Sequence, residues 1–406
     1  MTAKHGSVLG GMLLITGSCI GAGMLALPIL TGLAGFFPTL LMFFLAWGFM
    51  TTTALLLVEV NGWHKKPVNL LTMVGETLGK TGRYLSWVLY LLLFYSLLVA
   101  YMTLSGNHVH SFADHLLGMH IPDYAGTLFF VLLFGWLIFL GTRAVDYLNR
   151  LLMVGKIVAF LLLVFIGVRY MQPDLLLQNN LSLAFFSLPV LIISFGFHNM
   201  IPTLTNYMKG DTARVKKAIL AGSIFTLVLY LLWEILILGI LSGGEILSAF
   251  KDDIDAAQAL KNLLKAPSLG FTAQALAFFA VLTSLLAQSL GLSHFIADGL
   301  KISHGDRREN PWTALLALLP PLIFTMLFPQ LFFEAINFAG GICAVILFGI
   351  FPVMMVWIGR YRDKKEGSYR HFAGKVSLSL IFLFALFIFF YQLSQMLGLQ
   401  IFARPG

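Results

Sequence analysis

The chain has 406 residues, of which 59% are hydrophobic and only 11% are charged. Soluble domains carry about 25% charged residues, so this composition excludes a soluble globular protein and predicts an all-α integral membrane protein. The formal net charge of +8 must then reflect membrane topology, and we expect no nucleic-acid partner.

The apolar runs predict eleven membrane-spanning helices, because a helix needs about 20 apolar residues to cross the hydrocarbon core. In chain order they lie near residues 7–31, 35–61, 84–108, 124–142, 148–170, 183–208, 215–242, 271–298, 312–329, 334–358 and 375–397. Two connections are longer than a turn. Residues 62–83 favour a short amphipathic helix at the membrane surface. Residues 243–270 favour a surface helix that either acts as an external lid or has no gating role.

Lysine and arginine are distributed unequally between the two sides of the predicted spans. Twenty of the 26 lie on alternate connections that begin with the N-terminus, five lie on the opposite side, and Lys156 lies within the fifth span. Because basic residues accumulate on the cytoplasmic side, we expect a cytoplasmic N-terminus and a C-terminus on the outer side.

The first span contains the stretch GSCIGAGMLALP, which includes Gly17, Gly21, Gly23 and Pro28. In a helix interior, glycine costs about 1 kcal/mol and proline about 3 kcal/mol relative to alanine. Unwound backbone survives at membrane depth only where protein buries it or where it lines a polar cavity. The stretch therefore predicts a helix that opens at mid-membrane. The alternative is close helix packing, whose four-residue spacing fits Gly17 and Gly21 but not Gly23 and Pro28.

The sixth span is interrupted in a similar way, at SFGFHN (residues 194–199), with Pro202 shortly after. Spans one and six are five apart, so they cross the bilayer in opposite directions. Paired breaks of this kind indicate an inverted-repeat transporter with a site at the membrane midplane. We therefore expect a single transmembrane domain (residues 1–406) with repeats at 7–170 and 183–358 and an additional helix at 375–397.

Three strings, GSCIGAGMLALP in span one, NRLLMVGKI in span five and SFGFHNMIP in span six, resemble the bacterial hydroxy and aromatic amino acid permeases of the amino acid–polyamine–organocation superfamily. The resemblance covers essentially the whole chain. It implies a leucine-transporter-like five-plus-five fold in a bacterial inner membrane, with a periplasmic C-terminus, that imports an aromatic amino acid with protons. Tyrosine is the favoured substrate, and tryptophan, phenylalanine or a hydroxy amino acid such as serine are alternatives. A membrane-embedded enzyme or a channel is a remote alternative, because the long connections carry no paired catalytic motifs.

An amino acid presents a carboxylate and an ammonium, and a broken helix can bind both through its backbone. We expect the amides of Gly21, Ala22 and Gly23, at the start of the second half-helix, to bind the carboxylate. Carbonyl groups near Gly17 and Ser18 would accept hydrogen bonds from the ammonium. Further candidates for the pocket are Phe195 with its carbonyl group, Tyr101, Gly196, Phe197, His198, Asn199, Ser284, Gln288, Asn337 and Phe338. Because the chain has 37 phenylalanines, such rings are alternatively core or lipid-facing. We expect no cofactor, no metal and no obligate protein partner.

Two charged side chains lie inside predicted spans. Lys156 lies eight residues into the fifth span, about 12 Å from its cytoplasmic end at 1.5 Å per residue. A lysine near mid-helix costs about 2.5–3.5 kcal/mol to insert, so it either has a role or snorkels to the interface. By the resemblance, Lys156 lies where sodium-coupled relatives bind a cation, which makes it the expected proton carrier. Glu234 stands where family members commonly carry glutamine, and is either a second proton site or a neutral hydrogen-bonding acid. Glu59, Asp298 and Glu334 lie at span ends, where we expect solvated or capping roles.

Overall fold

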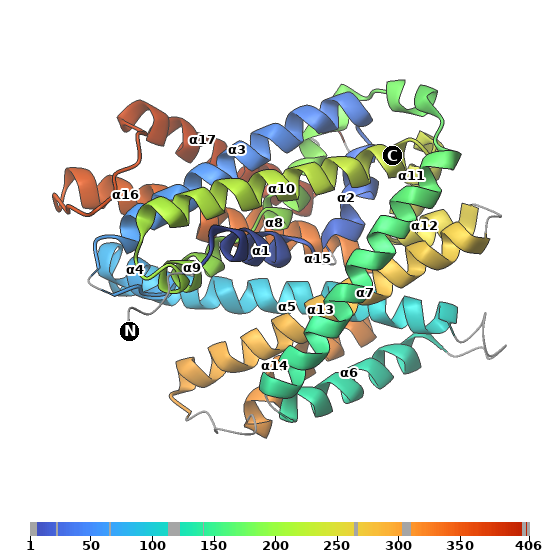
Figure 1. Ribbon diagram of the computed structural model, residues 1–406, viewed down its shortest axis with the longest axis horizontal. Coiled ribbons are helices and arrows are strands. Elements are labelled where there is room, and N and C mark those ends of the chain that lie inside the picture. Colours follow the sequence, from blue (N-terminus) through green and yellow to red (C-terminus); the bar gives the residue numbers. More distant parts are fainter. Residues whose placement is uncertain are drawn as a thin grey trace.

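The computed structural model describes residues 6–21, 23–64, 66–112, 122–140, 142–263, 267–302, 310–399 and 403. Within these ranges the regular elements are helices, and a single β-bridge pairs Gly35 with Asn179. The long helices run side by side in one bundle, with the short helix α4 near one end and α11 and α12 near the other (Figure 1). The predicted all-α class is confirmed.

Eight helices in the described ranges are long and apolar enough to cross a membrane. They are α3 (Phe36–Asn61), α5 (Gly79–Phe112), α7 (Thr142–Gly167), α10 (Thr212–Leu238), α13 (Pro267–Leu300), α17 (Lys375–Met396) and two composite segments, Leu181–Tyr207 and Phe332–Tyr361. A further candidate is the pair α1 (Val8–Cys19) and α2 (Gly23–Gly32), which is bent by 62°. Two shorter helices, α6 (Asp123–Phe139) and α14 (Pro311–Leu327), are also apolar. The chain is thus a multi-pass membrane protein, and the count of eleven spans stays a prediction.

Both predicted helix breaks are present. α1 ends at Cys19, and α2 begins only at Gly23. In the Leu181–Tyr207 segment, α8 (Leu188–Ser194) ends before a short non-helical stretch, and a tight 3-10 turn at His198–Met200 leads into α9 (Ile201–Tyr207). Each break interrupts the regular helical hydrogen bonds, so the last carbonyl groups of α1 and α8 need other partners.

The helix α10 supplies partners for both breaks. The Tyr230 hydroxyl lies 2.7 Å from the Cys19 carbonyl oxygen and 3.0 Å from the Ser194 carbonyl oxygen, so it joins the ends of α1 and α8. The Trp233 indole N–H donates to the Met24 carbonyl oxygen at 2.9 Å. An unsatisfied backbone group in hydrocarbon costs several kcal/mol. These two fully buried side chains therefore stabilise the interrupted conformation of both helices.

Both long connections contain helices, as predicted. They are α4 (Leu70–Thr77) in the first, and α11 (Gly243–Lys251) and α12 (Ala256–Leu263) in the second. Between α11 and α12, the Asp253 carboxylate accepts hydrogen bonds from the Phe332 and Phe333 N–H groups at 2.8 and 3.0 Å. Asp253 thus attaches the second connection to the start of α15 (Phe332–Phe338). Whether this connection acts as a lid stays a prediction.

The sequence did not predict the π-helix η6 (Ala339–Ile350), which joins α15 to α16 (Phe351–Tyr361). η6 packs closely against α8, and a Cβ atom at Gly340 would overlap the Pro189 carbonyl group. Glycine at this position therefore allows the two backbones to approach. The approach places Phe348 of η6 next to the break that follows α8.

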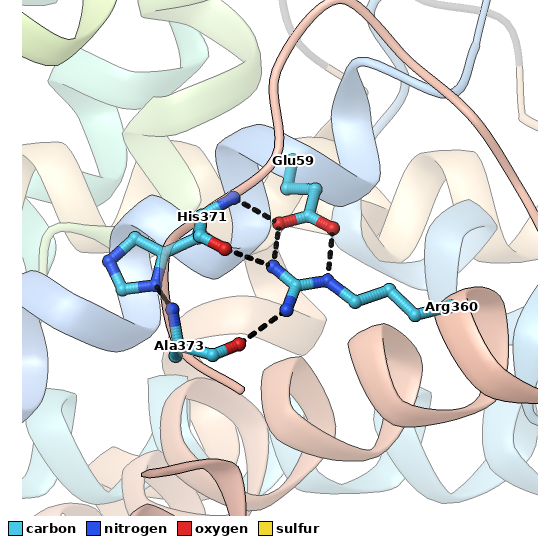
Figure 2. Close-up of polar contacts among 4 residues, drawn as sticks. All are labelled: Glu59, Arg360, His371 and Ala373. Carbon is cyan, nitrogen blue, oxygen red and sulfur yellow. Dashed lines mark hydrogen bonds and ion pairs between the residues drawn. The ribbon is translucent and has the colours of Figure 1, made fainter. Parts of the chain in front are cut away.

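A buried ion pair ties together the ends of α3 and α16 and the segment before α17 (Figure 2). The Arg360 guanidinium donates two N–H groups to the Glu59 carboxylate, with Nε 2.6 Å from Oε1, and donates to the carbonyl oxygens of His371 and Ala373. The same carboxylate accepts the His371 N–H at 2.6 Å. Because the Arg360 and Glu59 side chains are only 3% and 2% exposed, the expected solvated or capping role of Glu59 is wrong. The carboxylate is instead paired and fully hydrogen-bonded inside the protein.

Candidate functional site

A cavity of about 270 Å³ lies where the two helix breaks meet. Its walls come from the end of α1 and the residues that follow, from the end of α8 and the residues that follow, and from α5, α7 and α13. The predicted site residues that line it are Gly17, Ser18, Gly21, Gly23, Tyr101, Lys156, Gly196, Asn199, Ser284 and Gln288. Candidate residues from five separate predicted spans therefore converge on one cavity.

The backbone at the first break differs from the expectation in one respect. The Gly21 N–H donates to the Cys19 carbonyl oxygen at 2.8 Å, so it is not free for a ligand as predicted. The Gly23 N–H, at the start of α2, lines the cavity and has no hydrogen-bond acceptor among the described residues. The predicted Ala22 amide lies outside the described residues. The usable donor at this helix N-terminus is therefore Gly23 rather than Gly21.

The two glycines of α1 and its break have different surroundings. A Cβ atom built on Gly21 would lie 2.8 Å from Ser284 Oγ and 3.9 Å from the Tyr101 hydroxyl. A Cβ atom built on Gly17 would meet only Met153 Cε, at 3.9 Å. Gly21 therefore sits at a tight contact between the first break and α13, whereas Gly17 borders open space in the cavity.

Lys156 is the one charged side chain among the described residues that line the cavity. It is 3% exposed, and its Nζ donates to the Ile20 carbonyl oxygen at 2.7 Å and lies 3.4 Å from Thr283 Oγ1. Ile20 belongs to the first helix break. The ammonium therefore points into the protein and stabilises a carbonyl group that the break has freed, whereas a snorkelling lysine would reach toward the interface.

One wall of the cavity is aromatic. Tyr90 and Phe94 of α5 have ring centroids 6.4 Å apart, and the Tyr90 ring lies 6.2 Å from that of Phe348. These rings line the cavity together with Tyr101. The planes of the two ring pairs are inclined by 33° and 65°, so the rings form an apolar wall of faces and edges against which an aromatic ligand group can pack.

Sequence reasoning missed several residues of the cavity, namely Tyr90, Phe94, Asn149, Met153, Thr283 and Phe348. Asn149 had a recognisable signal, because it precedes Lys156 by seven residues, or two helical turns, and so shares its face of α7. The Asn149 Oδ1 atom is buried and has no hydrogen-bond partner in the part of the chain that the structure describes. It is therefore available to accept a hydrogen bond from a ligand.

Three predicted residues of the second break pack behind the cavity rather than lining it. Phe195 is fully buried, with its ring 5.3 Å from that of Tyr230. The His198 ring stacks on Phe348 with centroids 4.9 Å apart, and its Nε2 lies 2.9 Å from the Thr53 hydroxyl oxygen. Phe197 is also fully buried and stacks on His198. His198 therefore packs against Phe348, a ring of the cavity wall, from outside the cavity.

The remaining candidates lie elsewhere. Asn337 and Phe338 line a second cavity. Glu234 is fully buried on α10, where its carboxyl group accepts a hydrogen bond from the Thr31 hydroxyl of α2. Glu234 thus connects α10 to α2, and it lies outside the lining of the central cavity.

The fold and the cavity define the class of this protein. A multi-pass helical membrane protein whose polar cavity lies at two interrupted helices has the organisation of a secondary transporter. The chain is 31% identical over 385 residues to the tyrosine-specific transport system 1 of Haemophilus influenzae, which covers 94% of this chain and 95% of the relative. It is 31% identical over 412 residues to the tryptophan-specific transport protein of the same organism, covering 97% of each. It is 28% identical over 401 residues to the low affinity tryptophan permease of Escherichia coli, covering 94% of each.

The tryptophan/tyrosine permease family matches residues 4–392, and the chain belongs to this family. The resemblance predicted from the three sequence strings is thereby confirmed. The relatives carry the names of transport proteins and permeases, so the family is one of transporters rather than enzymes.

Proposed function

We propose that this chain imports an aromatic amino acid by proton symport with alternating access, with tyrosine as the first candidate substrate and tryptophan as the second. The observation that carries the proposal is the buried Lys156 ammonium, which binds the freed Ile20 carbonyl group at the edge of the cavity. A tyrosine-specific and a tryptophan-specific relative are both 31% identical to the chain. Their names support the substrate class without ranking the two amino acids.

The proposed architecture is a five-plus-five inverted repeat (residues 7–170 and 183–358) with an eleventh helix, in a bacterial inner membrane with the N-terminus in the cytoplasm. The opposed breaks in spans one and six support the repeat. The eight long helices, the bent pair α1–α2 and the two shorter helices would together make the eleven spans. The asymmetry of lysine and arginine supports the orientation.

In the proposed binding mode, the backbone recognises what all amino acids share. The substrate carboxylate binds at the N-terminus of α2, where the Gly23 N–H lies at the positive end of the helix dipole. The ammonium faces carbonyl groups near Gly17 and Ser18. The aromatic ring of the substrate lies against Tyr90 and Phe94. The hydroxyl group of a tyrosine substrate, or the indole N–H of a tryptophan substrate, binds polar side chains of the same cavity.

The proposed proton coupling acts through the contact between Lys156 and the Ile20 carbonyl group. A protonated lysine holds the Ile20 carbonyl by a charge-assisted hydrogen bond, which is about twice as strong as one between neutral groups. Loss of the proton weakens that bond and so loosens the break that carries the substrate carboxylate. Protonation of Lys156 and the geometry of the substrate site are therefore linked.

Glu234 is the second proton candidate, and two roles remain for it. It either exchanges the coupled proton or stays protonated as a neutral partner of Thr31. Its complete burial favours the neutral acid, because an isolated carboxylate is costly in an apolar environment. Glu234→Gln would retain proton-driven uptake in the second case and lose it in the first.

The test is uptake of labelled tyrosine and tryptophan by proteoliposomes that contain the purified full-length chain. We expect accumulation when the outside is made more acidic than the inside, in the absence of sodium, and no accumulation in protein-free liposomes. Competition by unlabelled tyrosine, tryptophan, phenylalanine and serine then ranks the substrates. Uptake that needs sodium and ignores the pH gradient would contradict proton symport, and preferential competition by serine would contradict the aromatic substrate class.

A further inference from the structure

The structure contains a second and larger cavity, of about 750 Å³, between α5, α14, α15 and α17. None of its lining residues lines the central cavity. Three apolar side chains at its rim, Leu92, Phe324 and Met396, are 39%, 56% and 53% exposed. Leu92 and Met396 belong to α5 and α17, two helices long and apolar enough to cross a membrane, so part of the exposed lining lies on the flank of these helices. The lining also includes Phe250 of α11.

Polar side chains of this cavity come from α5 (Tyr95 and Ser96), α17 (Gln392 and Gln395) and α15. Glu334 and Asn337 both line it, and their i, i+3 spacing places them one helical turn apart on the same face. Glu334 is exposed, whereas Asn337 is 8% exposed and its Oδ1 atom has no hydrogen-bond partner among the described residues. A buried acceptor without a donor is destabilising. A ligand that donates a hydrogen bond to Asn337 would offset this destabilisation.

The charge and the aromatic side chains of the lining indicate which class of ligand this cavity would bind. Glu334 is its one carboxylate, and no lysine or arginine occurs among the described residues that line it. The other walls are rich in aromatic rings, including Tyr95, Phe324 and Phe333. A carboxylate and aromatic faces both attract a cation, whereas a substrate carboxylate would be repelled by Glu334 and would find no basic partner.

We propose that this second cavity, defined by the lining residues of α5, α14, α15 and α17, binds an arylalkyl amine cation. The ammonium pairs with Glu334, the ring packs among Tyr95, Phe324 and Phe333, and a ring N–H or O–H donates to Asn337 Oδ1. A full amino acid fits this site poorly, because its carboxylate would be repelled by Glu334 and would have no lysine or arginine to pair with among the described lining residues. The site is therefore distinct from the central cavity in both position and charge preference.

The test is equilibrium binding of tritiated tryptamine to the full-length protein in phosphatidylcholine nanodiscs. We expect Glu334→Gln to weaken binding at least tenfold, and the exposed, distant Glu366→Gln to leave it unchanged. Uncharged indole should compete at least tenfold less well than tryptamine, and excess tyrosine should not displace the probe. The indole comparison uses the native chain and does not depend on the folding of a variant.

Three results would overturn the proposal. If tryptamine binds to Glu334→Gln as tightly as to the native chain, the carboxylate has no role in binding. Displacement by tyrosine would place tryptamine in the central cavity. Tenfold weaker binding in phosphatidylethanolamine than in phosphatidylcholine nanodiscs would identify a membrane lipid with a primary ammonium as the occupant.

Discussion

Adding one methyl group at Gly21 should weaken the binding of an aromatic amino acid by roughly tenfold to a hundredfold. The added Cβ would lie 2.8 Å from Ser284 Oγ, whereas ordinary contacts begin near 3.4 Å. Either the Ser284 hydroxyl must turn to another rotamer, or the break of α1 or the facing turn of α13 must move, and all of these line the cavity. Overpacking of this kind costs about 1–3 kcal/mol, and about 1.4 kcal/mol corresponds to tenfold in affinity.

The assay is equilibrium binding of labelled tyrosine and tryptophan to the purified native chain and to Gly21→Ala. Gly48→Ala in α3 is the matched control, because its Cβ would meet no described atom within 4 Å and Gly48 lies outside the cavity lining, and it should bind within about twofold of the native chain. Ser284→Ala combined with Gly21→Ala should restore much of the affinity, because the Ser284 Cβ lies at an ordinary 3.8 Å from the added atom. Equal losses in both glycine variants, or unchanged affinity in Gly21→Ala, would refute the proposed contact between the first break and α13.

Three further predictions concern the contacts that hold the fold around this site. Tyr230→Phe removes the donor that the Cys19 and Ser194 carbonyl groups share, and the Cys19 oxygen keeps only the Gly21 N–H. A buried group that loses its partner costs about 1–3 kcal/mol. The thermal unfolding temperature of this variant should fall by several degrees, and an unchanged value would show that another donor replaces the hydroxyl. Glu59→Gln leaves the Arg360 charge buried and unpaired, so a loss of about 3–5 kcal/mol is expected in denaturant unfolding; a loss below about 1 kcal/mol would contradict this. At Asp253, burial raises the carboxyl pKa from 3.8 to about 6. The folded protein then holds this proton more tightly than the unfolded chain, so stability should fall as the pH rises from about 4 to 6. The unfolding temperature of the native chain relative to Asp253→Asn should fall across that range, and a constant difference would contradict the assignment.

The breaks were predictable because their signals are local. Gly21, Gly23 and Pro28 disfavour a continuous helix through the intrinsic conformational preferences of glycine and proline, and Gly196 and Pro202 act in the same way in the second segment. The first interruption includes Gly21 and ends at Gly23, and the second includes Gly196, whereas Pro28 and Pro202 lie within the helices that follow. The π-helix η6 was not predictable, since it depends on how Gly340 packs against Pro189 from a distant segment.

The sequence predicted which segments form the site better than it predicted which individual side chains line it. Lys156 could be identified because a charge inside a span is conspicuous in any sequence. The orientation of Phe195 and His198 could not, because it depends on their packing against Tyr230 and Phe348, which come from other helices. The Tyr230 bridge was missed for the same reason: a tyrosine among many aromatic residues in a span carries no signal until the carbonyl groups that it contacts are brought together by the fold.

The measurement that tests proton coupling most directly is transport by Lys156→Gln in proteoliposomes, with the exposed Lys80→Gln as the control. Glutamine keeps a donor for the Ile20 carbonyl and removes the titratable charge. We predict that Lys156→Gln retains exchange of labelled tyrosine or tryptophan for internal substrate but loses accumulation driven by an inward proton gradient, while Lys80→Gln retains both. Full proton-driven accumulation by Lys156→Gln would contradict the assignment of Lys156 as the proton carrier.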